Sequence, residues 1–145
     1  MKAMDKYDAL KLENQLCFPL YACAREVVKR YRPYLDELGL TYTQYIAMMV
    51  FWEKGTCSAK ELGEKLHLDS GTLTPVLKSL EKKGYVKRGR LPKDERLLIV
   101  DITTEGEALK ERAVEIPKRV AECINLNPGE AAALYETLYK ILGDK

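Results

Sequence analysis

Apolar residues recur every three or four positions along most of the chain, and this pattern predicts a mainly helical fold. The first run extends from Tyr7 to Tyr31 and predicts one long helix. Pro19 is expected to kink this helix because proline lacks an amide donor, and Pro33 is expected to end it. A second apolar run, Thr43 to Glu53, predicts another helix that stops at Gly55.

Two short helices separated by a tight turn are predicted next. The sequence Ser58-Ala59-Lys60-Glu61 is typical of a capping box and predicts a helix start. After a turn at 67–69, Asp69 or Ser70 is expected to cap another helix that stops at Gly84. The buried stripe of that helix is predicted to be Leu73, Val76, Leu77 and Leu80. Two short helices joined in this way form the outline of a helix-turn-helix.

Two β-prone runs follow, at 85–88 and 96–102, with Pro92 in the loop between them. They predict a hairpin directly behind the second short helix, which is the wing of a winged helix-turn-helix. Further helices are predicted from Thr104 to Cys123 and from Asn127 to Leu142. The fold class is therefore mainly α with a small β-hairpin wing, in a single protomer spanning 1–145. Residues 43–103 form the expected DNA-binding part, and the apolar helices of 1–35 and 104–145 are the expected dimerisation helices.

Length and composition exclude several classes of protein. The 145 residues suffice for one packed core, and no stretch is long and apolar enough to cross a bilayer. No signal peptide is visible, so a soluble, cytoplasmic protein without membrane contact is expected. Four scattered cysteines and one histidine predict neither a disulfide framework nor a metal site. No glycine-rich phosphate loop is present, and no cofactor is predicted.

The net charge of +2 hides a strongly uneven distribution. Residues 78–96 hold eight cations and three anions, a net +5, so the rest of the chain carries −3. Such a segment on a helix and hairpin favours double-stranded DNA as partner. Small residues at the start of the helix allow close approach to base edges, and arginines at the wing suit the minor groove. The predicted contact residues are Ser70, Gly71, Thr72, Thr74, Pro75, Lys78, Lys82, Arg88, Arg90, Asp94 and Arg96.

Three motifs resemble those of a known family. The wing sequence Lys93-Asp94-Glu95-Arg96, followed by Leu98, Val100 and Ile102-Thr103, is similar to the signature of the MarR family of winged-helix repressors. The segments 12–18 (LENQLCF) and 68–75 (LDSGTLTP) resemble a narrower group, the organic hydroperoxide resistance regulators. The resemblance covers nearly the full length of the chain. It implies a homodimer that binds a pseudo-palindromic operator and leaves it when organic hydroperoxide oxidises a cysteine.

The resemblance also implies a redox site. The sensing cysteine of that group matches Cys17, and the two tyrosines that hold its thiolate across the dimer match Tyr31 and Tyr42. Cys123 lies near the second cysteine that some members use to complete an intersubunit disulfide, so it is the candidate resolving residue. The chain departs from the group at Pro19, which is expected to distort the helix that carries the sensor.

Three alternatives stay open at this point. A MarR-type repressor released by a small phenolic or lipophilic ligand would leave Cys17 structural. A winged domain used only for protein contacts would leave the basic segment without a nucleic-acid partner. A thiol peroxidase would use Cys17 in turnover, but no βαβ pattern flanks this cysteine, so an enzyme is not expected.

Overall fold

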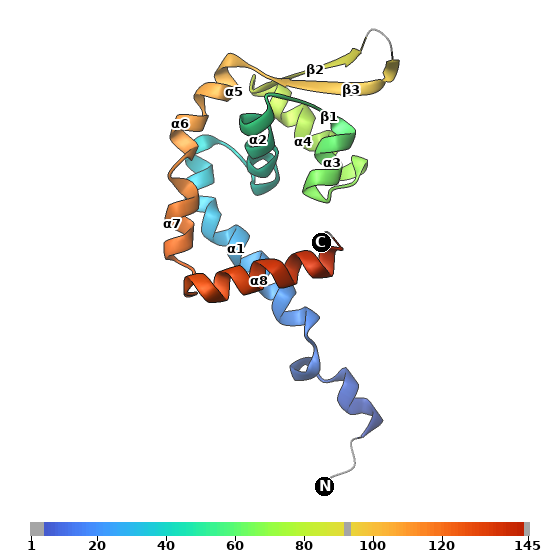
Figure 1. Cartoon of the computed structure of the whole chain (residues 1–145), viewed down its shortest axis with the longest axis vertical. Helices are drawn as coiled ribbons and strands as arrows, with labels where there is room; N and C mark the ends of the chain where they lie inside the picture. Colours follow the sequence, from blue (N-terminus) through green and yellow to red (C-terminus); the bar gives the residue numbers. More distant parts are fainter. Residues whose placement is uncertain (1–4, 92–93, 144–145) are drawn as a thin grey trace. The chain divides into compact units, whose positions relative to one another are not determined.

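The computed structural model describes residues 5–91 and 94–143, without the side chains of 90–96. The chain forms two compact units, Met1–Val114 and Glu115–Lys145, which are described separately below. Within the described residues, no helix has the length and apolar character needed to cross a membrane. The fold is mostly helical with one small antiparallel sheet, as the sequence predicts (Figure 1).

The predicted helix from Tyr7 is wrong at its start. Two 3-10 turns, η1 (Lys6–Leu10) and η2 (Leu12–Asn14), precede α1, which begins at Cys17 and extends to Leu38. The Asn14 side chain donates to the Asp8 carbonyl oxygen, 2.7 Å away, and the Gln15 side chain donates to two further carbonyl oxygens. Side-chain bonds to the backbone replace the helical pattern here, as polar residues often do at helix ends.

The two prolines of α1 do not act as the pattern predicts. Pro19 is the third residue of α1, where backbone amides have no intrahelical acceptor, so its missing N–H costs no helical hydrogen bond. The distortion expected next to Cys17 is therefore absent. Pro33 does not end the helix, which continues to Leu38. Leu35 and Leu38 are both buried. Burying two leucines contributes about 3–6 kcal/mol, which equals or exceeds the roughly 3 kcal/mol cost of an interior proline.

The helix-turn-helix is confirmed, and each of its helices begins at a side-chain cap. The helices are α2 (Tyr42–Lys54), α3 (Ala59–Leu66) and α4 (Ser70–Lys82). Ser58 caps α3 by accepting from the Glu61 amide, and Asp69 caps α4 by accepting from the Thr72 amide at 2.8 Å. The Glu61 carboxylate pairs with Lys54, so only half of the predicted capping box forms.

The wing is part of a three-stranded antiparallel sheet of order β1-β3-β2. β2 (Val86–Leu91) and β3 (Asp94–Ile102) form the predicted hairpin. β1 (Thr56–Ser58) pairs with the other edge of β3, with Cys57 opposite Val100. β1 was not predicted from the sequence, because three residues are too few to show an alternating pattern. The sheet joins the start of α3 to the base of the wing (Figure 1).

The core of the first unit lies between α2, α3, α4 and the sheet. The predicted α4 stripe is buried as expected, and α2 contributes its largest side chains. The main core residues are Tyr45, Met48, Phe51, Leu62, Leu73, Val76, Leu77, Leu80, Val86 and Val100. This packing fixes α4 with its opposite face outward.

The predicted helix from Thr104 to Cys123 is broken into three. α5 (Thr104–Ala108) and α6 (Lys110–Ala113) belong to the first unit, and α7 (Ile116–Glu122) belongs to the second. Pro117 has no N–H to donate to the carbonyl four residues earlier, which is one reason for the break after Ala113. The last predicted helix is confirmed as α8 (Pro128–Leu142), capped by Asn127.

Candidate nucleic-acid interface and redox site

The outward face of α4 carries the residues predicted to contact DNA. Ser70, Gly71, Thr72, Thr74, Pro75, Lys78 and Lys82 are all exposed. The Thr72 amide donates to Asp69 and holds the pKa of that carboxyl below its ordinary value, so the cap stays charged near neutral pH. Pro75 lies inside α4 without ending it, and the Thr74 hydroxyl donates to the Ser70 carbonyl oxygen at 2.7 Å. The start of α4 is thus a narrow, small-residue edge.

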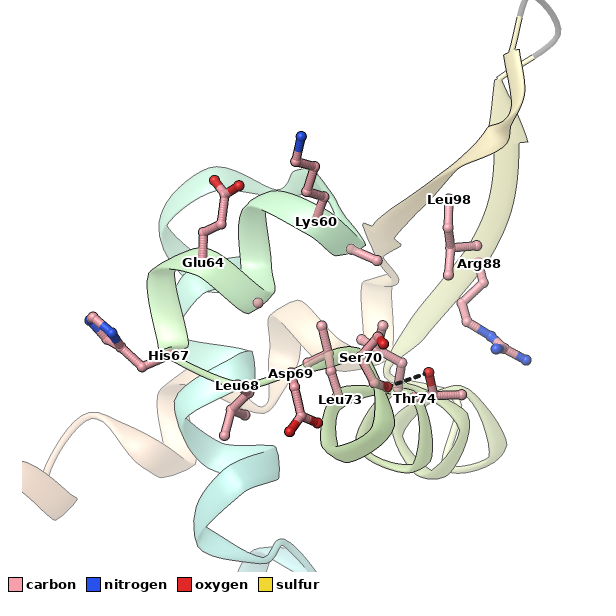
Figure 2. Close-up of a pocket in the computed structure, with 13 residues that line it drawn as sticks. Lys60, Glu64, His67, Leu68, Asp69, Ser70, Leu73, Thr74, Arg88 and Leu98 are labelled. Atoms are coloured by element: carbon pink, nitrogen blue, oxygen red, sulfur yellow. Dashed lines mark hydrogen bonds between the residues drawn. The ribbon is translucent and has the colours of Figure 1, made fainter.

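A hollow of about 570 Å³ lies beside this edge. Its lining comes from α3, the following turn, the first turns of α4, and strands β2 and β3. Figure 2 shows Ser70, Thr74 and Arg88 on the side of α4 and β2, while Lys60 and Glu64 point outward from α3 and His67 points outward from the turn after it. The hollow therefore lies between α3, the start of α4 and the base of the wing.

Glu81 of α4 binds Arg88 of β2 and so connects the wing to α4. It accepts from the Arg88 backbone amide at 2.9 Å and from the guanidinium at 3.0 and 3.1 Å. The Arg88 amide and guanidinium hold the pKa of Glu81 below its ordinary value. Arg88, predicted as a DNA contact, is therefore half-buried and engaged within the protein. The Arg90, Asp94 and Arg96 side chains, also predicted contacts, lie outside the described part of the structure.

A polar network that sequence reasoning missed joins α2 to the end of α4. Gln44 is buried, and its side-chain amide donates to the Ser79 hydroxyl at 2.9 Å. Its carbonyl oxygen accepts from Lys83 and from the Thr41 amide. Lys83 also donates to the Gly39 carbonyl oxygen. Its ammonium group is therefore bonded within the protein, unlike the exposed lysines on the outward face of α4. The one signal in the sequence is the spacing of Thr41 and Gln44, which form a capping box.

Tyr31 and Tyr42, the predicted sensor tyrosines, lie together with Tyr45. The Tyr31 and Tyr42 ring centroids are 5.1 Å apart, and Tyr45 is 5.6 Å from Tyr31 and 6.2 Å from Tyr42. Burial raises the pKa of Tyr31 and Tyr42, and it raises the pKa of Tyr45 to about 12. These phenols are neutral near pH 7, so each retains an O–H donor. The sequence did not predict that Tyr45 joins this cluster, although its spacing of three from Tyr42 places both on one helix face.

The four cysteines occupy different environments. Cys17, Cys23 and Cys123 are exposed, whereas Cys57 is buried, and burial raises the pKa of its thiol. The Cys123 sulfur lies 3.5 Å from the Arg119 carbonyl oxygen in the second unit. Across residues 5–91 and 94–143, no cluster of three or more His, Cys, Asp and Glu side chains could hold a metal ion.

Cys17 and Tyr31 lie far apart along the same helix. Cys17 is the first residue of α1 and Tyr31 follows fourteen residues later, so their backbones are about 21 Å apart. This separation is far greater than the reach of the two side chains. A contact between Cys17 and a tyrosine of the cluster therefore requires a tyrosine from a second copy of the chain.

Comparisons with known proteins agree with this architecture. The family described as transcriptional regulator SarA/Rot matches residues 29–113. The organic hydroperoxide resistance transcriptional regulator of Bacillus subtilis is 46% identical and aligns over 95% of this chain and 94% of its own. AbfR of Staphylococcus epidermidis, in its reduced form bound to DNA, is 35% identical to this chain and superposes with a TM-score of 0.79. The match covers 95% of this chain and 96% of AbfR. A MarR variant from E. coli in complex with operator DNA is 25% identical with a TM-score of 0.77, covering 96% and 99%.

Proposed function

Because this chain belongs to the MarR-type winged-helix transcriptional regulators that include the organic hydroperoxide resistance regulators, we propose that it is a redox-sensing repressor. It binds an operator as a homodimer and leaves it when organic hydroperoxide oxidises Cys17. The AbfR relative has been solved reduced on DNA and also with a disulfide formed, which supports a cysteine-based switch in this fold.

The observation that carries the proposal is the geometry of the redox site. Cys17 is exposed at the first turn of α1, and its own Tyr31 is about 21 Å away along that helix. The neutral phenols of Tyr31 and Tyr42, which are only part-buried, can donate to an anion, and the buried Tyr45 packs behind them. Two antiparallel copies of α1 would bring the Cys17 of each protomer to the tyrosine cluster of the other. The site is therefore complete only in a dimer.

In this proposal α4 and the wing bind the DNA. The exposed edge from Ser70 to Pro75 enters the major groove, because its small side chains let the helix approach base edges. Lys78 and Lys82 contact phosphates, and the wing, on which the sequence predicts Arg90, Asp94 and Arg96 as contacts, faces the minor groove. Arg88 contributes by holding the wing to α4 through Glu81. The helices of 1–35 and 104–145 form the dimer and set the spacing of the two recognition helices.

Oxidation converts the site from an anion to a bulkier neutral group. The Cys17 thiolate attacks one peroxide oxygen, the O–O bond breaks, and the leaving alkoxide takes a proton to become an alcohol. Cys17 becomes a sulfenic acid, which condenses with a second thiol to form a disulfide and water. The exposed Cys123 of the partner is the proposed second thiol. The phenols of Tyr31 and Tyr42 lose the charge that held them, and the dimer interface changes.

This chemistry is stoichiometric signalling rather than turnover. Each oxidation event consumes one Cys17 thiolate and changes the dimer interface once, without turnover. The protein is therefore not proposed to be an enzyme. It needs no cofactor, because the thiolate itself reacts with the peroxide.

Release from operator DNA tests the sensor. The parent, titrated with cumene hydroperoxide, is expected to leave the operator, and Cys17→Ser is expected to stay bound. Cys23→Ser is the matched control, since Cys23 is another exposed thiol on α1. Equal release of Cys17→Ser and parent would place the sensor elsewhere. Release of both by a phenolic ligand, with hydroperoxide inert, would instead favour a ligand-controlled repressor.

The salt dependence of binding tests the DNA face. Lys82→Ala is expected to weaken operator and random DNA alike and to reduce the slope of log K against log salt by about 1, as loss of one phosphate contact does. Lys110→Ala removes an exposed cation of α6 and serves as control. Identical slopes for parent and Lys82→Ala would remove Lys82 from the interface.

A further inference from the structure

Trp52, the only tryptophan of the chain, contacts both the tyrosine cluster and the base of the wing. Its ring meets Tyr45 edge-on, with the centroids 6.3 Å apart and the planes at 67°. Its indole N–H donates to the Gly106 carbonyl oxygen at 2.9 Å, 54 positions further along the chain. A single side chain of α2 therefore joins Tyr45 to the first turn of α5.

That turn of α5 is bonded to the ends of both wing strands. The Thr103 hydroxyl, directly after β3, accepts from the Gly106 amide at 3.1 Å and donates to the Gly84 carbonyl oxygen. The Thr103 amide donates to the Tyr85 carbonyl oxygen at 3.0 Å, just before β2 begins. These bonds connect Gly106 to the residues that directly precede β2 and directly follow β3.

The acceptor of the indole bond is a group that the helix itself leaves open. α5 has only five residues and ends at Ala108, so the Gly106 carbonyl is also among its last four carbonyls, which have no intrahelical donor. Gly106 is buried. A buried carbonyl without a donor costs free energy, so the bond from Trp52 holds this turn at a fixed distance from α2.

We propose that Trp52 is a positioning residue that couples the oxidation state of Cys17 to the wing. The inference rests on the proposed function, in which Tyr31 and Tyr42 hold the Cys17 thiolate of the partner. Tyr45 lies against both of these tyrosines and against Trp52. When oxidation displaces Tyr31 and Tyr42, Tyr45 repacks, Trp52 shifts with it, and the indole bond moves the base of the wing.

Trp52→Phe separates the two contacts, because phenylalanine keeps a ring against Tyr45 and lacks the N–H. The ratio of the operator Kd of oxidised protein to that of reduced protein is expected to fall about 3–30-fold, the range over which residues between coupled sites change coupling. The reduced Kd and the rate of Cys17 oxidation are expected to remain within about twofold of the parent. A residue with a merely structural role would not change the ratio alone.

Phe51→Leu is the matched control. Phe51 is the neighbouring core residue of α2 and is fully buried, so its substitution loosens the core without removing the indole bond. It is expected to lower the unfolding temperature while keeping the ratio of the two Kd values. An equal fall of the ratio in Phe51→Leu and Trp52→Phe would overturn the inference.

The fluorescence of Trp52 gives a second measurement on the parent itself. Full oxidation of Cys17 by cumene hydroperoxide is expected to change the emission of the parent, whereas Cys17→Ser is expected to show no change. Unchanged emission, or a Kd ratio in Trp52→Phe equal to that of a parent that does release, overturns the inference and leaves the proposed function intact. A parent that is oxidised at Cys17 and stays on the operator contradicts the proposed function itself.

Discussion

Replacing Gly106 by alanine tests how closely α5 is packed against the base of the wing. A Cβ atom at this position would lie 2.2 Å from the Tyr85 carbonyl oxygen and 2.9 Å from Ile102 Cγ1. The first of these distances is far below van der Waals contact, and its partner is backbone. The chain must therefore move by about 1 Å before an alanine can fit.

The cost follows from what that movement disturbs. Overpacking of a core position costs about 1–3 kcal/mol. The Tyr85 carbonyl oxygen accepts from the Thr103 amide at 3.0 Å, and a shift of this size stretches that bond beyond useful range, for a further ~0.5–1.5 kcal/mol. Alanine recovers about 1 kcal/mol of helix propensity over glycine. We expect Gly106→Ala to lower the free energy of unfolding by about 2 kcal/mol.

Urea unfolding followed by far-UV circular dichroism measures this loss, at equal protomer concentration because dimer dissociation contributes to stability. Gly89→Ala is the control, because a Cβ on Gly89 meets nothing within 4 Å. It is expected to change stability by less than about 0.5 kcal/mol. A Gly106→Ala protein as stable as the parent would show that the wing base is not packed as described.

Three further predictions follow from buried or paired groups. Leu80→Ala removes a fully buried side chain of α4 and is expected to cost about 2–5 kcal/mol of stability in the same urea assay; a loss below 1 kcal/mol would contradict its core position. Tyr45, with its pKa raised to about 12, binds its proton more tightly folded than unfolded, so stability is expected to fall between pH 10 and about 12, and less steeply in Tyr45→Phe. Glu81, with its pKa lowered by Arg88, stabilises the fold while ionised, so its contribution is present above its ordinary pKa and is lost as the pH falls through its folded pKa. Acid unfolding should then be less pH-dependent in Glu81→Gln, and an unchanged profile would show that the pair adds nothing.

Local patterns predicted the helix starts and the buried stripe of α4 well. The buried stripe of α4, the caps at Ser58 and Asp69 and the capped start of α8 depend on residues within one helix turn. The outward face of α4 follows directly from that stripe. These features are visible in sequence because the interactions that create them span three or four positions.

Tertiary contacts account for what the sequence could not show. The α1 helix persists past Pro33 because Leu35 and Leu38 are buried by other elements. Lys83 counts as a basic residue in the sequence, yet in the fold it bonds to Gly39 and Gln44. The bond from Trp52 to Gly106 joins residues 54 positions apart, and no local pattern indicates it.

The geometry of the proposed redox site could not be predicted from the sequence for a different reason. A single chain contains both parts of the proposed site, but the straight course of α1 keeps Cys17 and Tyr31 about 21 Å apart. The resemblance implied that the tyrosines act across a dimer, and only the length of the uninterrupted helix gives a physical reason for it.

The most direct test follows the oxidation of Cys17 and the release of DNA in one sample. The protein, bound to its operator, is titrated with cumene hydroperoxide, and each step is divided between fluorescence anisotropy of the DNA and peptide mass spectrometry of the cysteines. We predict that the fraction of DNA released rises in proportion to the fraction of Cys17 oxidised, with Cys23 and Cys57 still reduced. Release while Cys17 remains a thiol, or full oxidation of Cys17 with the operator still bound, would contradict it.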